Sequence, residues 1–127
     1  MMPSRLRLRD YLVHIATAIE HIQEYTAALT KDDFFEDRLV QDAVIRNLEV
    51  IGEASHQLRT HHADFVAEHP DLPLGEAYEM RNALAHGYFV VDLNVVWETI
   101  SHDLQPLRIR VIGLVSSEDI TPASPTI

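Results

Sequence analysis

The sequence contains no cysteine, and this absence excludes several kinds of chemistry at once. Without thiols there can be no disulfide scaffold, no thiolate nucleophile and no cysteine-based zinc site. A chain without disulfides suits a reducing compartment, so we expect a cytoplasmic location.

Glycine and long apolar runs are also scarce. The four glycines form no Gly-rich phosphate loop, and no G-x-S-x-G pattern occurs. No apolar run approaches the roughly 18 residues that a membrane-spanning helix needs, so no membrane association is expected. The first ten residues, MMPSRLRLRD, are basic but lead into no apolar stretch, which predicts no signal peptide.

Positive charge is in short supply. Ten basic residues, nine of them arginine, stand against 20 acidic ones, and the formal net charge is −10. Such a chain cannot attract nucleic acid by bulk charge, so any RNA contact must use a local cationic spot. Arginine suits that task because it binds phosphate bidentately and keeps its charge. The acidity serves either solubility or a surface for a basic partner protein.

What the sequence does have is helical periodicity. With 127 residues and 46% apolar content, the chain fits one domain with its own core. Apolar residues recur every three to four positions, which predicts helices over residues 5–29, 37–60, 73–86 and 93–115. Short connections between four helices indicate an all-α antiparallel four-helix bundle. We assign residues 1–115 to this domain and expect the polar, Pro-rich segment 116–127 to be a flexible tail.

Helix-breaking and helix-capping residues set the expected helix boundaries. TKDDFFED (30–37) holds a cap candidate and a short turn, and HPDLPLGE (69–76) breaks the helical pattern. Pro106 should kink the last helix because it lacks a backbone donor. The expected capping residues are Ser4, Pro73 at the first position of the third helix, Gly87 after its end, and Asp92.

The stretch RNALAHGYFVVD (81–92) carries the residues best suited to chemistry: Arg81, His86 and Tyr88. A histidine and tyrosine beside a helix-ending glycine can be plain C-capping. The alternative is an active site. A spacing of five residues separates Arg81 and His86 by about 140° on a helix. Two copies facing each other across a two-fold axis would bring both groups into one shared cleft.

A second pair, Arg9 and His14, has the same spacing. It falls inside a long amphipathic helix, so we interpret it as an exposed arginine and a histidine on the helix surface.

Taken with its flanking blocks, the Arg81 stretch resembles the R-x4-H-x-Y motif of HepT-like proteins in the HEPN superfamily. DAVIRNLEVIGEA (42–54), MRNALAHGYFVVDLNVVW (80–97) and DLQPLR (103–108) resemble the family's conserved blocks, in order and at the expected spacing. The chain departs from the family at Leu74, where members often carry tryptophan, which concerns packing more than chemistry.

The resemblance implies a dimeric helical-bundle ribonuclease toxin that uses no metal and no cofactor. Its RNA-cleaving pair would be Arg81 and His86. It also implies an MntA-like nucleotidyltransferase antitoxin that attaches AMP to Tyr88, and leaves open a larger complex between the two proteins.

These residue types suit metal-free RNA cleavage. A histidine can take a proton from the ribose 2′-hydroxyl or give one to the leaving 5′-oxygen, and a fixed arginine can stabilise the charged phosphorane. Asn82 either positions the phosphate or His86, or is a solvated helix residue.

Asn47 falls on the apolar stripe of the second helix, flanked by Arg46, Glu49 and Glu53. It is either a hydrogen-bonded core amide or a polar wall of the cleft that orients Arg81 or His86. Because Arg46 can neutralise one carboxylate, a catalytic carboxylate pair is not expected.

Three further histidines, His56, His61 and His62, lack metal-ligand spacing, and we expect them in loops, with no metal site. Trp97 falls within the last predicted helix, beside its apolar stripe, and we interpret it as a packing residue.

Two other functions remain consistent with the sequence. The domain could be a non-catalytic HEPN module that binds nucleotide or RNA and acts through its partner. It could also be a structural helical adaptor.

Overall fold

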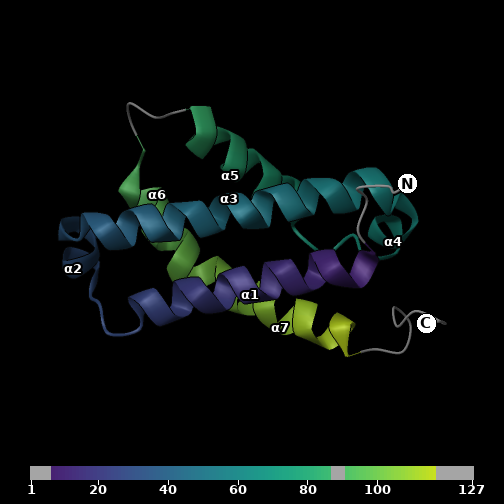
Figure 1. Ribbon diagram of the computed structural model, residues 1–127, viewed down its shortest axis with the longest axis horizontal. Coiled ribbons are helices and arrows are strands. Elements are labelled where there is room, and N and C mark those ends of the chain that lie inside the picture. The colour runs from purple at the N-terminus through teal and green to yellow at the C-terminus, as the bar shows by residue number, and fades with distance from the viewer. Residues whose placement is uncertain (1–6, 87–90, 117–127) are drawn as a thin grey trace.

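The computed structural model describes residues 7–86 and 91–116; of His86 it gives the backbone only. This part of the chain is helical and contains no strand (Figure 1). The elements are α1 (Leu8–Thr26), α2 (Lys31–Glu36), α3 (Arg38–His61), α4 (Ala63–Glu68), α5 (Leu74–His86), α6 (Leu93–Glu98), the π-helical turn η1 (Thr99–Asp103) and α7 (Leu104–Val115). Among these helices none is both long and apolar enough to cross a membrane.

The predicted four-helix bundle is confirmed. Its members are α1, α3, α5 and the continuous segment α6–η1–α7, and successive members run in opposite directions (Figure 1). Helix α3 packs extensively against both α1 and α5, and α7 packs against α1. Helix α3 is therefore the common support for the helices on either side of it.

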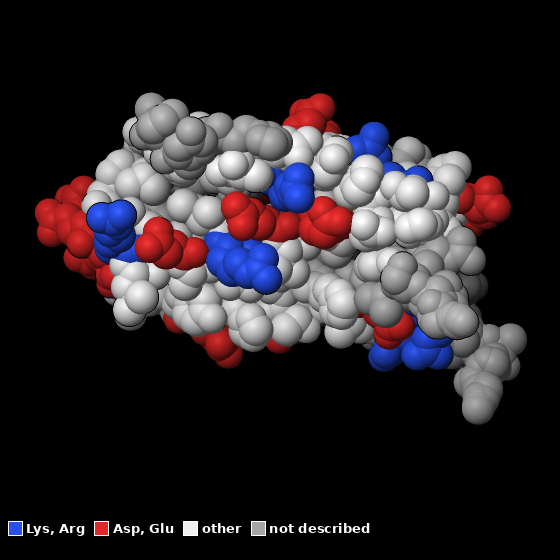
Figure 2. Space-filling view, turned by 45° about the horizontal axis from the view of Figure 1, so that its top comes forward, with Lys and Arg blue, Asp and Glu red and all other residues white. Residues whose placement is uncertain are grey.

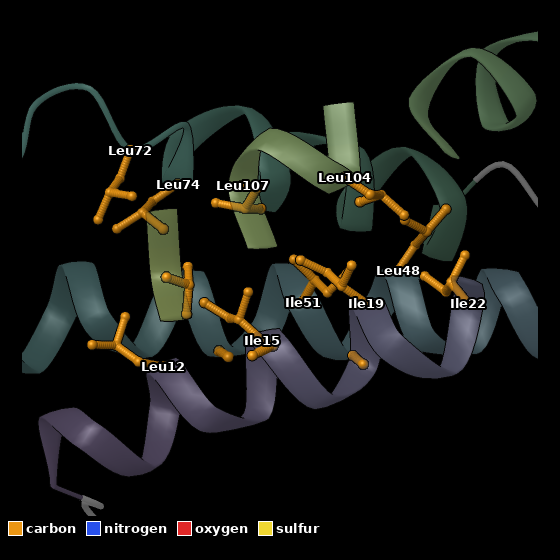
Figure 3. Packing of buried hydrophobic residues seen from close by; sticks show 14 of the residues in the cluster. Leu12, Ile15, Ile19, Ile22, Leu48, Ile51, Leu72, Leu74, Leu104 and Leu107 are labelled. Carbon is orange, nitrogen blue, oxygen red and sulfur yellow. The ribbon is translucent and has the colours of Figure 1, made fainter. Parts of the chain in front are cut away.

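The core lies between α1, α3 and α7 (Figure 3). Leucine, isoleucine and valine side chains at three- and four-residue spacing on these helices are almost completely buried, as the periodicity predicted. Phe34 of α2 and Val96 of α6 close one end, and Trp97 packs on the Phe34 ring at 5.3 Å between centroids, as expected. The residues that form the centre of the core are Leu12, Ile15, Ile19, Ile22, Val44, Leu48, Ile51, Leu58, Leu104, Leu107, Val111 and Leu114.

Two short helices were not predicted. Residues 31–36, expected as a turn, form α2, because Thr30 and Asp33 make a reciprocal capping box with two 3.1 Å hydrogen bonds. Helix α4 follows α3 directly and is anchored by buried Phe65. Among the expected caps, Asp92 accepts a hydrogen bond from the Asn94 amide, whereas Ser4 and Gly87 lie outside the described residues.

The boundaries of two predicted helices shift slightly. Helix α1 ends at Thr26 rather than residue 29, where a turn between Leu29 and Thr26 takes over. Pro73 stands directly before α5 and not within it, and its carbonyl accepts the Ala77 amide at 3.1 Å.

The last helix is interrupted close to the expected kink. The π-helical turn η1 ends three residues before Pro106. Val96 and Leu104 are eight residues apart, and a regular α-helix would place them about 80° out of line. Both side chains are nevertheless buried, 1% and 3% exposed. The wider π turn therefore absorbs the difference and brings both residues to the buried face.

Candidate functional site

Arg81 lies on the face of α5 that crosses α3. Its side chain is about one-third exposed and is held by two neighbours. Nη1 donates to Oδ1 of Asn82 at 2.9 Å, and Nη2 lies 3.6 Å from Oε1 of Glu53 on α3. The other carboxylate oxygen of Glu53 accepts a 2.8 Å hydrogen bond from Gln57. Asn82 and Glu53 thus hold the guanidinium directly, and Gln57 holds Glu53, while the guanidinium stays accessible.

The close crossing of α3 and α5 depends on Gly52. A Cβ atom at this position would lie 2.2 Å from Cβ of Arg81 and 2.7 Å from the carbonyl oxygen of Ala77. Only a residue without a side chain permits that approach. No motif in the sequence predicted this role of Gly52, although a glycine inside a long helix is itself a signal of close packing.

A groove runs beside Arg81, with α3 as its floor and with α1 and α5 as its walls. Its volume is about 440 Å³. Arg81 and Ala85, one turn apart, contribute the α5 wall. The full lining is Tyr11, His14, Arg46, Glu49, Val50, Glu53, Ala54, Gln57, Arg81 and Ala85.

The groove carries charges of both signs. Arg46 and Arg81 offer two guanidinium groups, and Glu49 and Glu53 offer two carboxylates. Among the described residues Glu53 pairs with Arg81, and Arg46 has no ion-pair partner. Arg46 therefore neutralises neither Glu49 nor Glu53, although the sequence predicted that it would neutralise one of them. Figure 2 shows acidic and basic side chains interspersed across one view of the molecule. Despite the net charge of −10, the groove is therefore not uniformly repulsive to an anion.

The structure brings only some of the predicted site residues together. Asn82 contacts Arg81 directly. Asn47 is half-buried and donates to the Ala43 carbonyl of its own helix at 2.9 Å; it does not line the groove. His86 is the last residue of α5 and follows Ala85, but its side chain is not described, and Tyr88 lies outside the described residues.

The remaining histidines are placed differently from expectation. His56 lies within α3, where it stacks on Tyr78 at 4.3 Å between ring centroids, and His61 is the last residue of that helix; only His62 connects two helices. In residues 7–86 and 91–116, no three histidine or carboxylate side chains gather in a way that could hold a metal ion. His14, expected on a plain helix surface, is exposed but lines the groove with Arg81.

A second, larger groove of about 660 Å³ lies between α5 and the last helix. Its floor is largely apolar, and its rim includes Asp71 and Arg110. Nε of Arg110 donates to Asp71 at 2.6 Å, and this hydrogen bond lowers the pKa of the Asp71 carboxyl and raises the pKa of the guanidinium. Arg110 contacts both oxygens of Asp71, at 2.6 and 3.2 Å, whereas the Arg81–Glu53 pair is 3.6 Å long. This groove therefore offers less to a phosphate than the groove beside Arg81.

The bundle and the Arg81 segment define a helical domain of the HEPN type. The model of the family described as ribonuclease HepT-like matches residues 15–112, and the chain belongs to this family.

Individual relatives agree with that assignment. The chain is 45% identical to a protein of Thermococcus cleftensis named "Probable ribonuclease HepT", over 100 residues that cover 79% of this chain and 88% of the relative. It is 34% identical to a "Putative RNase" of Caldanaerobacter subterraneus subsp. tengcongensis, over 87% of this chain and 96% of the relative.

A third relative is longer. A Methanocaldococcus jannaschii protein named as a gamma-glutamylcyclotransferase and putative RNase is 39% identical over 91% of this chain, which spans half of that protein. No solved structure matches the chain.

Proposed function

We propose that this protein is a metal-independent endoribonuclease in which Arg81 and His86 cleave RNA. The observation that carries the proposal is the state of Arg81, which is fixed by Asn82 and Glu53 yet open to a groove. The family, and the ribonuclease names of its relatives, support the same reaction class.

Arg81 is suited to bind the scissile phosphate. The guanidinium has five N–H donors, and its contacts to Asn82 and Glu53 leave donors for a ligand. The ion pair with Glu53 is long and partly exposed, so it contributes little energy and a phosphate can compete with it. Charge that develops on the phosphorane would be stabilised by a group that is already oriented.

His86 supplies the proton chemistry. It follows Ala85 at the end of α5, and a neutral imidazole there can take the 2′-hydroxyl proton. The 2′-oxygen attacks phosphorus, the bond from phosphorus to the 5′-oxygen breaks, and a second acidic group gives its proton to that oxygen. The products are a 2′,3′-cyclic phosphate and a 5′-hydroxyl. Pairing of two subunits across a two-fold axis would place both motifs in one cleft, so we propose that the active form is a homodimer.

The direct test is RNA cleavage in EDTA by the wild type and by the variants Arg81→Ala and His86→Ala. We expect each substitution to reduce cleavage at least 100-fold, because each removes transition-state stabilisation or proton transfer. Arg9→Ala is the matched control and should cleave normally, since Arg9 is an exposed arginine on α1 outside the groove. A wild-type protein that cleaves no RNA would overturn the proposal.

We further propose that the protein is the toxin of a toxin–antitoxin pair, silenced when an MntA-like nucleotidyltransferase attaches AMP to Tyr88. A bulky anion two residues beyond His86 would block the cleft and repel RNA. Co-expression with such an enzyme should add about 329 Da per AMP to the wild type and nothing to Tyr88→Phe. Addition of AMP at another residue would contradict this assignment.

A second candidate function is nucleotide or RNA binding without cleavage, which the carboxylates in the groove favour. Glu49 and Glu53 weaken the attraction of a polyanion, and a small nucleotide tolerates them better than a long RNA. Tight AMP or ATP binding by a protein that shows no nuclease activity would support this function over the first.

A further inference from the structure

The α1 wall of the groove presents a histidine that the R-x4-H motif does not include. His14 is exposed, and its ring meets that of Tyr11 edge-on at 6.4 Å between centroids. Of the histidine side chains that the structure describes, His14 is the one that lines the same groove as Arg81. Helices α1 and α5 are far apart in the sequence and lie on either side of α3 (Figure 1). They contribute His14 and Arg81 to the lining of one groove.

The reaction has a role for such a group. Cleavage through the 2′-oxygen needs one group to accept the 2′-hydroxyl proton and another to protonate the 5′-oxygen as its bond to phosphorus breaks. The motif supplies one imidazole per chain, His86. The second must come from the other subunit or from elsewhere in the same chain.

We propose that His14 contacts RNA in the Arg81 groove and carries one of the two proton transfers, an inference that rests on the proposed ribonuclease function. One imidazole gains the 2′-hydroxyl proton while the other gives its proton to the 5′-oxygen. Both return to their starting states by exchange with water. The groove of one chain then supplies an arginine for the phosphate and one of the two imidazoles, and His86 supplies the other.

The charged surroundings of His14 suit an anionic substrate. The titratable and charged groups that line the groove with His14 are Tyr11 on its own helix, Arg46, Glu49 and Glu53 on α3, and Arg81 on α5. Asp10 lies about one turn before His14 on α1. Asp10 is paired with Arg7, and Glu53 is paired with Arg81. A phosphate bound by Arg46 and Arg81 would lie between the two walls, within the groove that His14 lines.

The test compares His14→Asn with His21→Asn in single-turnover RNA cleavage from pH 5 to 9. His21 is a matched control, because it is an exposed histidine on the same face of α1, two turns further on, where it stacks on Tyr25. We expect His14→Asn to slow cleavage by about 100-fold or more and to remove one limb of the bell-shaped pH profile. His21→Asn should stay within about two-fold of the wild type, since surface substitutions away from a site are close to neutral.

Three outcomes would overturn the inference. If His14→Asn cleaves like the wild type while Arg81→Ala is inactive, the proposed function stands and His14 has no role. If His14→Asn lowers the rate equally at every pH, His14 transfers no proton and the second imidazole is His86 of the other subunit. If the wild type cleaves no RNA at all, the proposed function and this inference fail together.

Binding provides an independent readout that needs no turnover. A 2′-O-methyl RNA oligonucleotide cannot be cleaved through the 2′-oxygen, and it should shift the ring NMR signals of His14 but not those of His21. Unchanged His14 signals at saturation would contradict contact with RNA.

Discussion

At the scale of single residues, Gly52 and Arg81 form one unit. Gly52 lets the backbone of α3 come close to α5. This approach allows Glu53 to pair with Arg81 and to hold its guanidinium at the groove. The motif predicted Arg81, and Asn82 was predicted as a positioning residue because it is the next residue in the same helix, where it contacts Arg81. The motif could not identify Gly52, Glu53 or His14, because their roles depend on which helix faces pair in three dimensions.

Gly52→Ala tests this unit. The added methyl would meet both a Cβ atom and a backbone oxygen, so the two helices must separate. We expect the free energy of unfolding to fall by about 1–2 kcal/mol, after allowance for alanine's higher helix propensity. RNA cleavage should fall about 10-fold or more, because Arg81 is displaced. Urea denaturation and a cleavage assay on the same preparation measure both effects.

Gly113→Ala is the matched control for that substitution. Gly113 also lies inside a helix, α7, but nothing lies within 4 Å of the position that a Cβ would take. We expect this variant to gain about 0.5–1 kcal/mol of stability through helix propensity alone. Equal effects of the two substitutions would show that Gly52 does not set the helix spacing.

At the scale of elements, periodicity predicted the long helices, whereas one short helix depends on local capping and the other on burial. Helices α1 and α3 carry apolar stripes that mark both their type and their buried face. Helix α2 has only six residues, too few for a periodic pattern, and its existence depends on Thr30 and Asp33. Helix α4 depends on the burial of Phe65 against the rest of the bundle, which no local pattern reveals.

Thr30→Ala should therefore destabilise the protein through α2. It removes the hydroxyl that accepts the Asp33 amide, and we expect a loss of about 1 kcal/mol in the free energy of unfolding. Thr60→Ala, at an exposed site near the end of α3, should change stability by less than about 0.5 kcal/mol. Chemical denaturation distinguishes the two, and identical midpoints would show that the capping box contributes nothing.

At the scale of the whole molecule, an acidic protein that binds RNA must do so through few phosphate contacts. The groove holds two arginines, Arg46 and Arg81, against a net charge of −10. Most of the surface therefore repels RNA, and binding should be weaker and less sensitive to salt than that of a basic nuclease.

The salt dependence of RNA binding measures how many phosphates the protein contacts. With two phosphate contacts per groove, log K for a 2′-O-methyl RNA should fall against log salt with a slope of about −1.4. Arg46→Ala should make the slope shallower by about 0.7, whereas Arg38→Ala, exposed at the start of α3 and outside the groove, should leave it unchanged. Fluorescence anisotropy between about 50 and 200 mM salt measures the slope. A slope unaffected by Arg46→Ala would place the RNA elsewhere.

The π-helical turn in the last helix has an evolutionary consequence. Each residue advances an α-helix by about 100°, so an insertion or deletion within a helix normally rotates everything beyond it. Here, however, deleting one residue from Thr99–Asp103 would convert the π turn to α-helix and leave Val96 and Leu104 seven residues apart, only about 20° out of line. Leu104, Leu107 and Val111 would stay on the buried face. The length of this segment can therefore change by one residue during evolution without compensating changes along α7.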